Sequence, residues 1–498
     1  MAGERKKPAS VAQNKLVAGF LLLIALVIVI WFISPRASFM VGAGLAGIAW
    51  LVLCLKRPLW SFNVLLFMFL TIYTRVKLGM IEVEGPGNRG AGALCDILWL
   101  TMLIIWSARD FVVQSEFRFR IPVGKQPLSL WIMLPFVFLA TVLPIAGIFL
   151  DAWPVSYAIP GLRQLQWASF AILAYSLVRS FGPERVLRGI VSTVAIATFT
   201  HTIYAIIQLG YSIGWLSRTW VILDDLFSKH NVSSWFYYPR LTGLLVNPNS
   251  YGLYGAFALV IALAIIFAKA ERKHVVLSWI ILICSGFALV FSASRSALLG
   301  LGVSIMMIIC ASFLSPRLMN RIFKVGIPLV ITFFILLKVM SPIMPVILQE
   351  RFLRFIQVFS EGVSADINAI TRVDMWSDLW RIYVTKYPFG TWVPVSYATG
   401  SAVDSFYVNT AVQGTPVFTF TWLCFLYGAA ALGWRSYQWG TIPLEAAIGL
   451  TLFGWSGMMA GSGLTLSPML QPQLIVPFMA LIGALLGCQY ERRLLSCS

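Results

Sequence analysis

The sequence predicts an all-helical protein that crosses a membrane many times. Of its 498 residues, 59% are hydrophobic and 11% are charged, and the mean hydropathy is +0.84. Average soluble domains carry about 25% charged residues, so a soluble globular protein is excluded. Because backbone polar groups inside a bilayer must bond within their own segment, the apolar stretches are expected to be helices.

These stretches predict about fourteen transmembrane helices, since a span needs roughly 20 apolar residues. The first stretch follows Arg5, Lys6 and Lys7 and has no small-residue cleavage site, which favours a retained helix over a signal peptide. In chain order, the expected spans lie near 16–33, 39–55, 59–75, 93–108, 128–150, 162–178, 189–214, 250–268, 275–291, 296–315, 325–341, 413–433, 443–461 and 471–489.

The largest interruption of this pattern is a polar stretch at 342–412. A connection of about 70 residues is far longer than an ordinary turn between spans, and such loops are usually functional. It divides the chain into three parts: helices with outward arginines at 1–341, a large outer loop at 342–412, and the last helices with a tail at 413–498.

One amphipathic helix is expected inside this loop, at 367–386. Trp376, Trp380 and Tyr383 recur at helical spacing on one face, and Gly390 helps to end the helix. The helix could lie on the membrane surface with its aromatic face down. Alternatively, it could form one wall of a glycan groove, and the two interpretations are compatible.

The net charge of +18 does not indicate nucleic-acid binding, because of where the basic residues lie. Cytoplasmic loops of membrane proteins keep an excess of Lys and Arg. This rule places both termini in the cytoplasm and the 342–412 loop outside, with anionic membrane lipids as partners of the basic residues. The basic clusters lie at 56–57, 109–125, 179–188, 269–273, 317–324 and 492–493.

Several kinds of site are not expected. The seven cysteines form no CxxC pair and lie mostly in expected spans, which excludes a disulfide framework and a cysteine zinc site. His201, His230 and His274 lie in separate segments, so spacing alone indicates neither a metal site nor a Ser-His-Asp triad. No cofactor and no metal are expected. The absence of a visible internal repeat weakens a transporter interpretation.

Four arginines are expected at the outer side, namely Arg163, Arg240, Arg295 and Arg372. A charged side chain is costly where it faces lipid, so each is expected to face a cavity or a partner. Arginine stays charged and presents a planar fork of donors, which suits a phosphate or diphosphate. For any one of them, the alternative is snorkelling at the membrane interface or pairing within a loop.

Asp404 stands just before the expected span at 413–433. A carboxylate near a membrane mouth can have a raised pKa and act as a general base. The alternative is an N-cap, because Asp or Ser before an apolar run often begins a helix. The sequence leaves both interpretations open.

Four segments together resemble the superfamily of O-antigen ligases and Wzy-type O-antigen polymerases. They are RLTGLLVNPNSYG, FSASRSALLG, TRVDMWSDLWRIYVTKYPFG and DSFYVNTAVQGTPVF, in that order within 155–435. In the ligases, the last element begins with a histidine implicated in activating the acceptor hydroxyl. Asp404 stands in that place here, and 342–412 contains no histidine, which favours a polymerase of O-antigen, capsule or exopolysaccharide.

The resemblance implies a metal-independent glycosyltransferase in the bacterial inner membrane. It would join oligosaccharide repeats carried on polyprenyl diphosphate at the periplasmic face. One lipid-linked repeat would be the donor and another the acceptor, and a chain-length regulator is a possible protein partner. The alternatives are an O-antigen ligase acting on lipid A core and a lipid-linked oligosaccharide flippase or other transporter. The residues implied are Arg240 and Arg295 on the diphosphate, Asp404 on the acceptor hydroxyl, and Arg163, Arg372, Asn247, Asn249, Asp374, Trp376, Asp378 and Trp380 on the substrates.

Overall fold

The computed structural model describes residues 35–71, 89–114, 128–150, 154, 159–221, 240–245, 247–268, 271–340, 367–381, 385–387, 389–393, 395, 405–467 and 471–497. Within these ranges the regular elements are helices and no strand is present. The all-helical prediction is therefore confirmed there. The expected first span at 16–33 and much of the 342–412 loop lie outside the described residues.

Each expected span from 39–55 onward coincides with a helix. The helices are α2 (Pro35–Lys56), α3 (Pro58–Thr71), α4 (Arg89–Gln114), α5 (Leu128–Leu150), α6 (Ile159–Phe181), α7 (Pro183–Ser212), α9 (Pro248–Phe267), α10 (Arg272–Ser292), α11 (Arg295–Ser312), α12 (Pro316–Arg321), α13 (Ile327–Met340), α15 (Ile367–Leu379), α17 (Phe406–Trp439), α18 (Pro443–Gly463) and α19 (Pro472–Cys497), with the short 3-10 helix η3 (Arg218–Val221) and the π-helical turn η5 (Ile322–Gly326) between them.

Among the described residues, seven helices are long and apolar enough to cross a membrane, namely α5, α7, α9, α10, α11, α17 and α19. Shorter apolar helical stretches lie at Ala46–Lys56, Pro58–Thr71 and Leu94–Ala108. These helices indicate a polytopic helical membrane protein. The number of fourteen spans stays a prediction.

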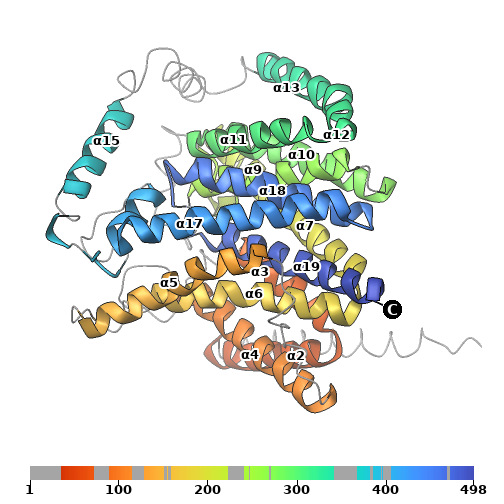
Figure 1. Cartoon of the computed structure of the whole chain (residues 1–498), viewed down its shortest axis with the longest axis vertical. Coiled ribbons are helices and arrows are strands. Elements are labelled where there is room, and N and C mark those ends of the chain that lie inside the picture. The colour runs from red at the N-terminus through yellow and green to blue at the C-terminus, as the bar shows by residue number, and fades with distance from the viewer. Residues whose placement is uncertain are drawn as a thin grey trace, which may run out of the picture.

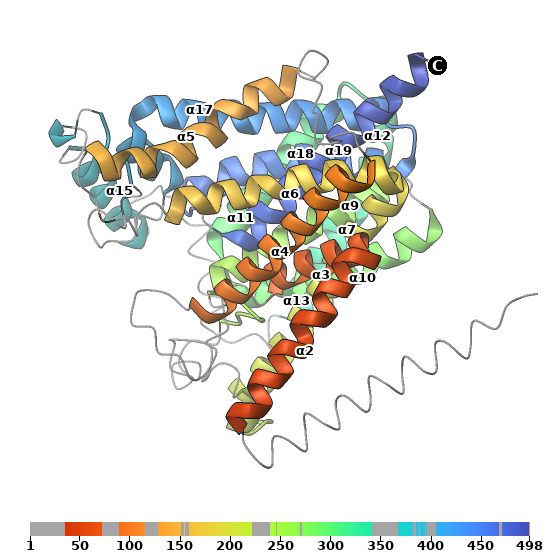
Figure 2. The ribbon, with the colours of Figure 1, turned by 90° about the horizontal axis from the view of Figure 1, so that it is seen from below.

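The long helices lie side by side in one bundle (Figure 1, Figure 2). Small residues bring neighbouring backbones together, as is usual between membrane helices. A Cβ added at Gly449 of α18 would lie 2.6 Å from the carbonyl oxygen of Gly433 on α17, and one at Gly300 of α11 would lie 2.9 Å from that of Met458 on α18. The helices α11, α17 and α18 therefore form one tightly packed group.

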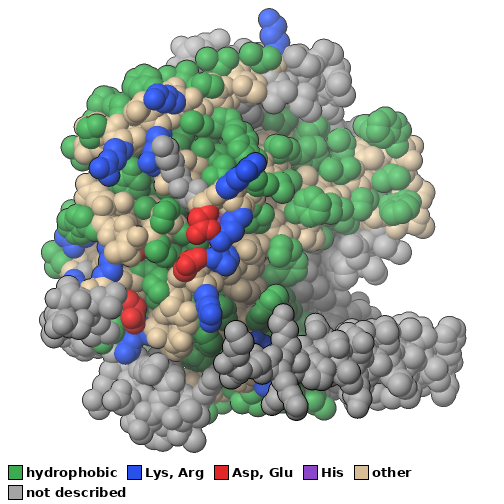
Figure 3. Space-filling view, turned by 90° about the vertical axis from the view of Figure 1, so that its right-hand side faces the viewer, with side chains coloured by type: hydrophobic (Ala, Val, Ile, Leu, Met, Phe, Trp, Pro, Cys, Tyr) green, Lys and Arg blue, Asp and Glu red, His purple; other side chains and the backbone are tan. Residues whose placement is uncertain are grey.

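The bundle has one strongly basic end, which Figure 3 shows face-on. It is the end where α6 and α19 finish, and we call it the basic end. Arg179 lies over the Tyr490 ring, Arg321 donates to the carbonyl of Phe267, and Arg492 pairs with the buried Glu445 at 2.8 Å. Basic residues of three separate helices thus gather at one end, as the positive-inside pattern predicts.

The opposite end is where α11 and α17 begin and where α15 lies beyond the bundle, at the left of Figure 1. We call it the α15 end. The expected loop helix is present, since α15 begins at Ile367 and helical backbone continues to Arg381.

The boundary of the loop differs from the sequence prediction. Residues 406–412, expected as the end of the loop, are already helical and belong to α17. That helix is broken inside, because Gly414 (φ −140°, ψ 31°) and Thr415 (φ 65°, ψ 172°) are not helical and Pro416 follows them. A short arm at 406–413 is thereby set off from the long part of α17.

Candidate functional site

The α15 end contains an irregular segment, 240–247, that leads into α9. A buried glutamine on α7 fixes it: the Gln208 side-chain oxygen accepts from the backbone N–H groups of Thr242 (3.1 Å) and Gly243 (3.0 Å). The Gln208 amide nitrogen donates to the Thr242 hydroxyl (2.9 Å) and the Gly243 carbonyl (3.1 Å). One side chain therefore forms four hydrogen bonds with this segment, in addition to the bond from the Thr242 hydroxyl to the Gly243 carbonyl at 3.3 Å.

A fully buried histidine continues this attachment. The N–H of Leu244 donates to His201 Nδ1 at 3.1 Å, so the ring proton is on Nε2, which donates to the carbonyl of Leu70 at 3.0 Å. Gly243 has φ 55°, and a Cβ there would lie 2.9 Å from the Tyr251 ring, so only glycine fits this turn without strain. His201 thus holds the segment in place.

The segment positions Arg240 at the C-terminal end of α10. Arg240 Nε donates to the carbonyl of Ser292 at 2.9 Å, and a terminal nitrogen donates to the side-chain oxygen of Asn249 at 2.7 Å. One backbone oxygen on α10 and one side-chain oxygen on α9 therefore fix the plane of the guanidinium group.

The two asparagines predicted to contact substrate have structural contacts here. Asn247 is the N-cap of α9, and its side-chain oxygen accepts from the N–H of Asn249 at 2.8 Å, with Pro248 as the first helical residue. Asn249 in turn holds Arg240. The Asn-Pro-Asn element therefore builds the start of α9 and orients the arginine beside it.

Arg295 begins α11, directly after the turn that receives Arg240. Ala293 has left-handed backbone (φ 46°), and Ser294 caps α11 by accepting from the N–H of Ala297 at 3.3 Å. Arg240 and Arg295 are therefore both attached to the α10–α11 turn, since Ser292, the acceptor for Arg240, is three residues from Arg295 in the chain. Arg295 itself is half-buried.

Close packing holds the α10–α11 turn against α9. A Cβ at Gly252 would lie 2.6 Å from Ser294 Cβ and 3.2 Å from Ala297 Cβ. Only a residue without a side chain lets the backbones approach this far. The α10–α11 turn, which leads into Arg295 and accepts a hydrogen bond from Arg240, therefore packs directly against α9.

The C-terminal end of α18 joins this turn to the start of α17. The Thr465 hydroxyl donates to Ser296 Oγ at 2.8 Å, and the Tyr407 hydroxyl donates to the carbonyl of Ala460 at 2.9 Å. Ser405 caps α17 and accepts from the N–H of Val408 at 3.5 Å. Asp404, the predicted base, lies outside the described residues, and the cap considered for it belongs to the next residue, Ser405.

The loop helix is mounted on the short arm of α17. Trp376 and Leu379 pack with Val395, Val408 and Val412 in a separate apolar cluster. Trp376, on the aromatic face of α15, therefore packs against the rest of the protein at this cluster. By contrast, Trp380 is 45% exposed, and Tyr383 lies outside the described residues.

The segment that follows α15 also lies along the short arm. The N–H groups of Thr391 and Trp392 donate to the carbonyls of Val412 and Gln413, each at 2.9 Å, and the N–H of Val395 donates to the Asn409 side chain at 3.0 Å. Together, these bonds join the end of the loop to the arm.

The remaining charged residues of the loop helix face outward. Asp374 and Asp378 are exposed, and Arg372 is half-buried. Asp378 and Arg381 are three residues apart, a spacing that suits an ion pair on a helix. In this part of the described chain they form no such pair, and both side chains are exposed.

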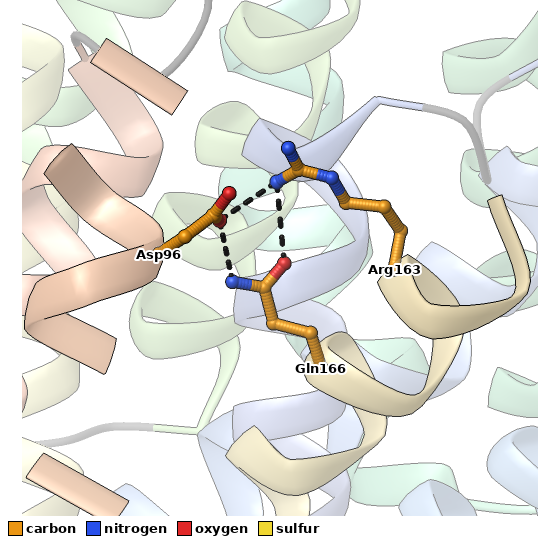
Figure 4. A network of polar contacts seen from close by, with 3 residues as sticks. All are labelled: Asp96, Arg163 and Gln166. Carbon is orange, nitrogen blue, oxygen red and sulfur yellow. Dashed lines mark hydrogen bonds and ion pairs between the residues drawn. The ribbon is translucent and has the colours of Figure 1, made fainter. Parts of the chain in front are cut away.

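Arg163 belongs to a different pair of helices. It lies on α6 and forms an ion pair with Asp96 of α4 at 2.7 Å, and Gln166 donates to the same carboxylate oxygen at 2.7 Å (Figure 4). Asp96 was not predicted as a site residue, although a carboxylate inside an expected span is a signal for a partner. Arg163 therefore pairs inside the protein, and its partner lies on the neighbouring helix α4.

Within the described part of the chain, no three His, Cys, Asp or Glu side chains gather closely enough to hold a metal ion. The residues that sequence reasoning missed are His201, Gln208 and Asp96. All three are polar or charged residues in otherwise apolar spans, and such residues usually find partners inside the protein.

Comparison of the chain with protein families and with curated protein sequences finds no match.

Proposed function

We propose that this protein is a polysaccharide polymerase that joins oligosaccharide repeats carried on a polyprenyl diphosphate. The observation that carries the proposal is that Arg240 is bonded to the α10–α11 turn at Ser292, three residues before Arg295. Two guanidinium groups at the edge of an apolar bundle suit a ligand with a diphosphate and a hydrocarbon chain. Arginine binds phosphate oxygens in a fixed fork geometry, which supports this assignment.

The reaction needs a leaving group, and the donor supplies it. The acceptor hydroxyl oxygen attacks the anomeric carbon of the donor sugar, and the bond from that carbon to the diphosphate oxygen breaks. Negative charge then grows on the departing polyprenyl diphosphate. Arg240 and Arg295 would stabilise this charge most strongly as it develops, which is the condition for catalysis rather than for binding alone.

The hydroxyl proton must be accepted as the new bond forms. We assign this role to Asp404, which immediately precedes the cap of α17, with Asp374 or Asp378 as substitutes. A single displacement of this kind inverts the anomeric carbon. Arg163 and Arg372 would contact the donor and acceptor, and Trp376 and Trp380 would contact sugar rings from α15.

The orientation follows from the charge distribution. Basic residues are retained on the cytoplasmic side, so the basic end would face the cytoplasm and the α15 end the periplasm. The site would then meet lipid-linked repeats on the outer face of a bacterial inner membrane. The loop at 342–412 would act as a lid over this site, and a chain-length regulator is the expected protein partner.

The test is complementation of a strain that lacks this gene, read as the ladder of surface glycan. Arg240→Ala and Arg295→Ala should each lower polymer formation at least about 100-fold, since the loss of one transition-state donor costs about that much. Arg272→Ala, at the exposed start of α10 on the basic end, is the matched control and should keep the ladder. All variants are compared at equal membrane abundance.

Three outcomes would revise the proposal. Full-length polymer from either arginine variant would contradict the diphosphate assignment. Normal polymer from Asp404→Asn would contradict the base assignment. Finally, a deletion strain without even a single attached repeat would indicate a ligase, because loss of a polymerase leaves one repeat attached.

A further inference from the structure

A groove separates α3 from α7 at the basic end of the bundle, far from the proposed site. It has a volume of about 440 Å³ and is partly open to the outside. Its apolar walls include Val64 and Phe67 of α3 and Ile196 of α7, and Arg185 and Arg188 line it as well. No described contact of the α10–α11 turn involves these residues.

The two helices run side by side in the same direction, which sets the level of each lining residue. A Cβ at Gly189 would lie 2.7 Å from the amide nitrogen of Asn63, and farther along both helices His201 bonds to the carbonyl of Leu70 at 3.0 Å. Arg185 and Arg188 precede Gly189, so they lie at the basic end of the groove. Ile196 follows Gly189, so it lies deeper.

The lining therefore changes in character along the groove. The arginines come first, then polar groups at the level of Asn63 and Ser192, and then the apolar walls. The amide nitrogen of Asn63, which lines the groove, is a donor that suits an ester oxygen. A glycerophospholipid has the same order, with a phosphate, then ester groups, then acyl chains.

The groove is also accessible from the side. Trp60 at its rim is 65% exposed and Ile196 is 59% exposed. Arg185 is exposed, and Arg188 pairs with Glu184 one turn earlier on α7. Lys56 and Arg57, both exposed, immediately precede α3, so the local charge around the mouth favours an anion.

We propose that this groove binds one anionic glycerophospholipid, with its phosphate at Arg185 and Arg188 and one acyl chain along Val64, Phe67 and Ile196. The lipid would fill the space between α3 and α7, and the amide N–H groups of Asn63 would face its ester oxygens. The proposal requires only that the bundle is embedded in a membrane. It does not depend on the reaction proposed for the α15 end.

The test is native mass spectrometry of the full-length protein, purified in detergent and titrated with phosphatidylglycerol or phosphatidylcholine. The wild-type protein should retain one phosphatidylglycerol more tightly than any phosphatidylcholine. The double variant Arg185→Gln, Arg188→Gln should weaken that binding about 25-fold, from about 5-fold for each basic residue near an anionic headgroup. Arg185→Lys, Arg188→Lys should keep it.

Two further variants separate a built groove from general attraction. Ser192→Phe fills the groove without a change of charge and should also remove the tightly bound lipid. Arg272→Gln, Lys273→Gln removes two charges from the same end of the bundle, outside the groove, and should leave lipid binding unchanged. Lys273 pairs with Glu271 much as Arg188 pairs with Glu184, so this control is closely matched.

Several results would overturn the proposal. They are equal retention by the wild type and the Arg185→Gln, Arg188→Gln variant, an equal loss in the Arg272→Gln, Lys273→Gln control, or unchanged binding in Ser192→Phe. Displacement of the lipid by glycerol phosphate or inorganic phosphate alone would also overturn it, because a headgroup site would then need no acyl chain.

Discussion

The proposed site has two halves that are attached to the bundle in different ways. The segment 240–247 is fixed by buried polar side chains of α7, which bond directly to its backbone. In contrast, α15 and the segment 390–395 rest on the short arm of α17 through one apolar cluster and a few hydrogen bonds. The first half is thus bonded to buried residues of the bundle, whereas the second packs against the bundle only at the short arm.

This difference suggests how the two halves divide the work. A diphosphate has a fixed geometry, and the segment that carries Arg240 is held by side chains of α7, so it cannot shift without disturbing that helix. A growing glycan varies along its length, and the wall that would contact it is attached through few contacts. Substitutions in the first half should therefore affect the whole bundle, and those in the second half should act locally.

The largest effect is expected from Gln208→Leu. It removes four hydrogen bonds to Thr242 and Gly243, each worth about 1 kcal/mol net, so a loss of about 4 kcal/mol is expected. Gln413→Leu is the counterpart on the short arm, where a single side-chain bond to Trp392 is lost, and should cost about 1 kcal/mol. Thermal unfolding in detergent, followed by tryptophan fluorescence, compares the two, and equal losses would abolish the distinction.

The next comparison uses one glycine from each half. Gly390 has φ 87°, and a Cβ there would overlap the backbone carbonyl of Gln413, so Gly390→Ala should free the segment 390–395 at a local cost of about 2 kcal/mol. Gly243→Ala meets the Tyr251 ring inside the core and should lower the unfolding temperature of the whole bundle instead.

Limited proteolysis and thermal unfolding distinguish these outcomes. Gly390→Ala should speed cleavage near 390–395 and leave the main unfolding transition in place. If it lowers that transition as much as Gly243→Ala does, the loop is part of the core after all.

A smaller effect is expected for the aromatic face of α15. Trp376→Ala removes a side chain that packs on Val408 and Val412, and burial of an aromatic of this kind is worth about 2 kcal/mol. Trp380→Ala, one turn later and 45% exposed, should change little. Protease sensitivity of the loop should rise only in the first variant, and the reverse order would mean that α15 faces the arm with its other side.

The smallest effect concerns the α4–α6 contact. Asp96→Asn removes one charge of a pair whose side chains are 29% and 33% exposed, so a loss of about 1 kcal/mol is expected after solvent screening. Glu184→Gln, at a more exposed pair on α7, is the control and should have less effect. Unfolding temperatures measured at low and high salt would test this, because a pair held by charge must weaken as salt is added.

The sequence predicted the helices, and it failed where contacts join distant segments. Hydrophobic stretches placed the helices, and the spacing of Asn247, Pro248 and Asn249 indicated a helix start. By contrast, nothing local shows that Gln208 reaches Thr242, because this contact depends on how α7 and α9 pack. The helical arm at 406–413 was missed because its polar residues look like loop, and the break after it at Gly414 and Thr415 resets the helical register.

The attachment of the segment 240–247 to α7 has a consequence for the order in which the protein is made. Segments enter the membrane from the N-terminus, so α7 is inserted while its partner segment is still unmade. His201 and Gln208 would then face lipid or translocation machinery with unsatisfied polar groups, which is costly inside a bilayer. Once the segment 240–247 has been made, it supplies partners for these polar groups. Placing Arg240 at the α10–α11 turn and completing the central bundle therefore become the same event.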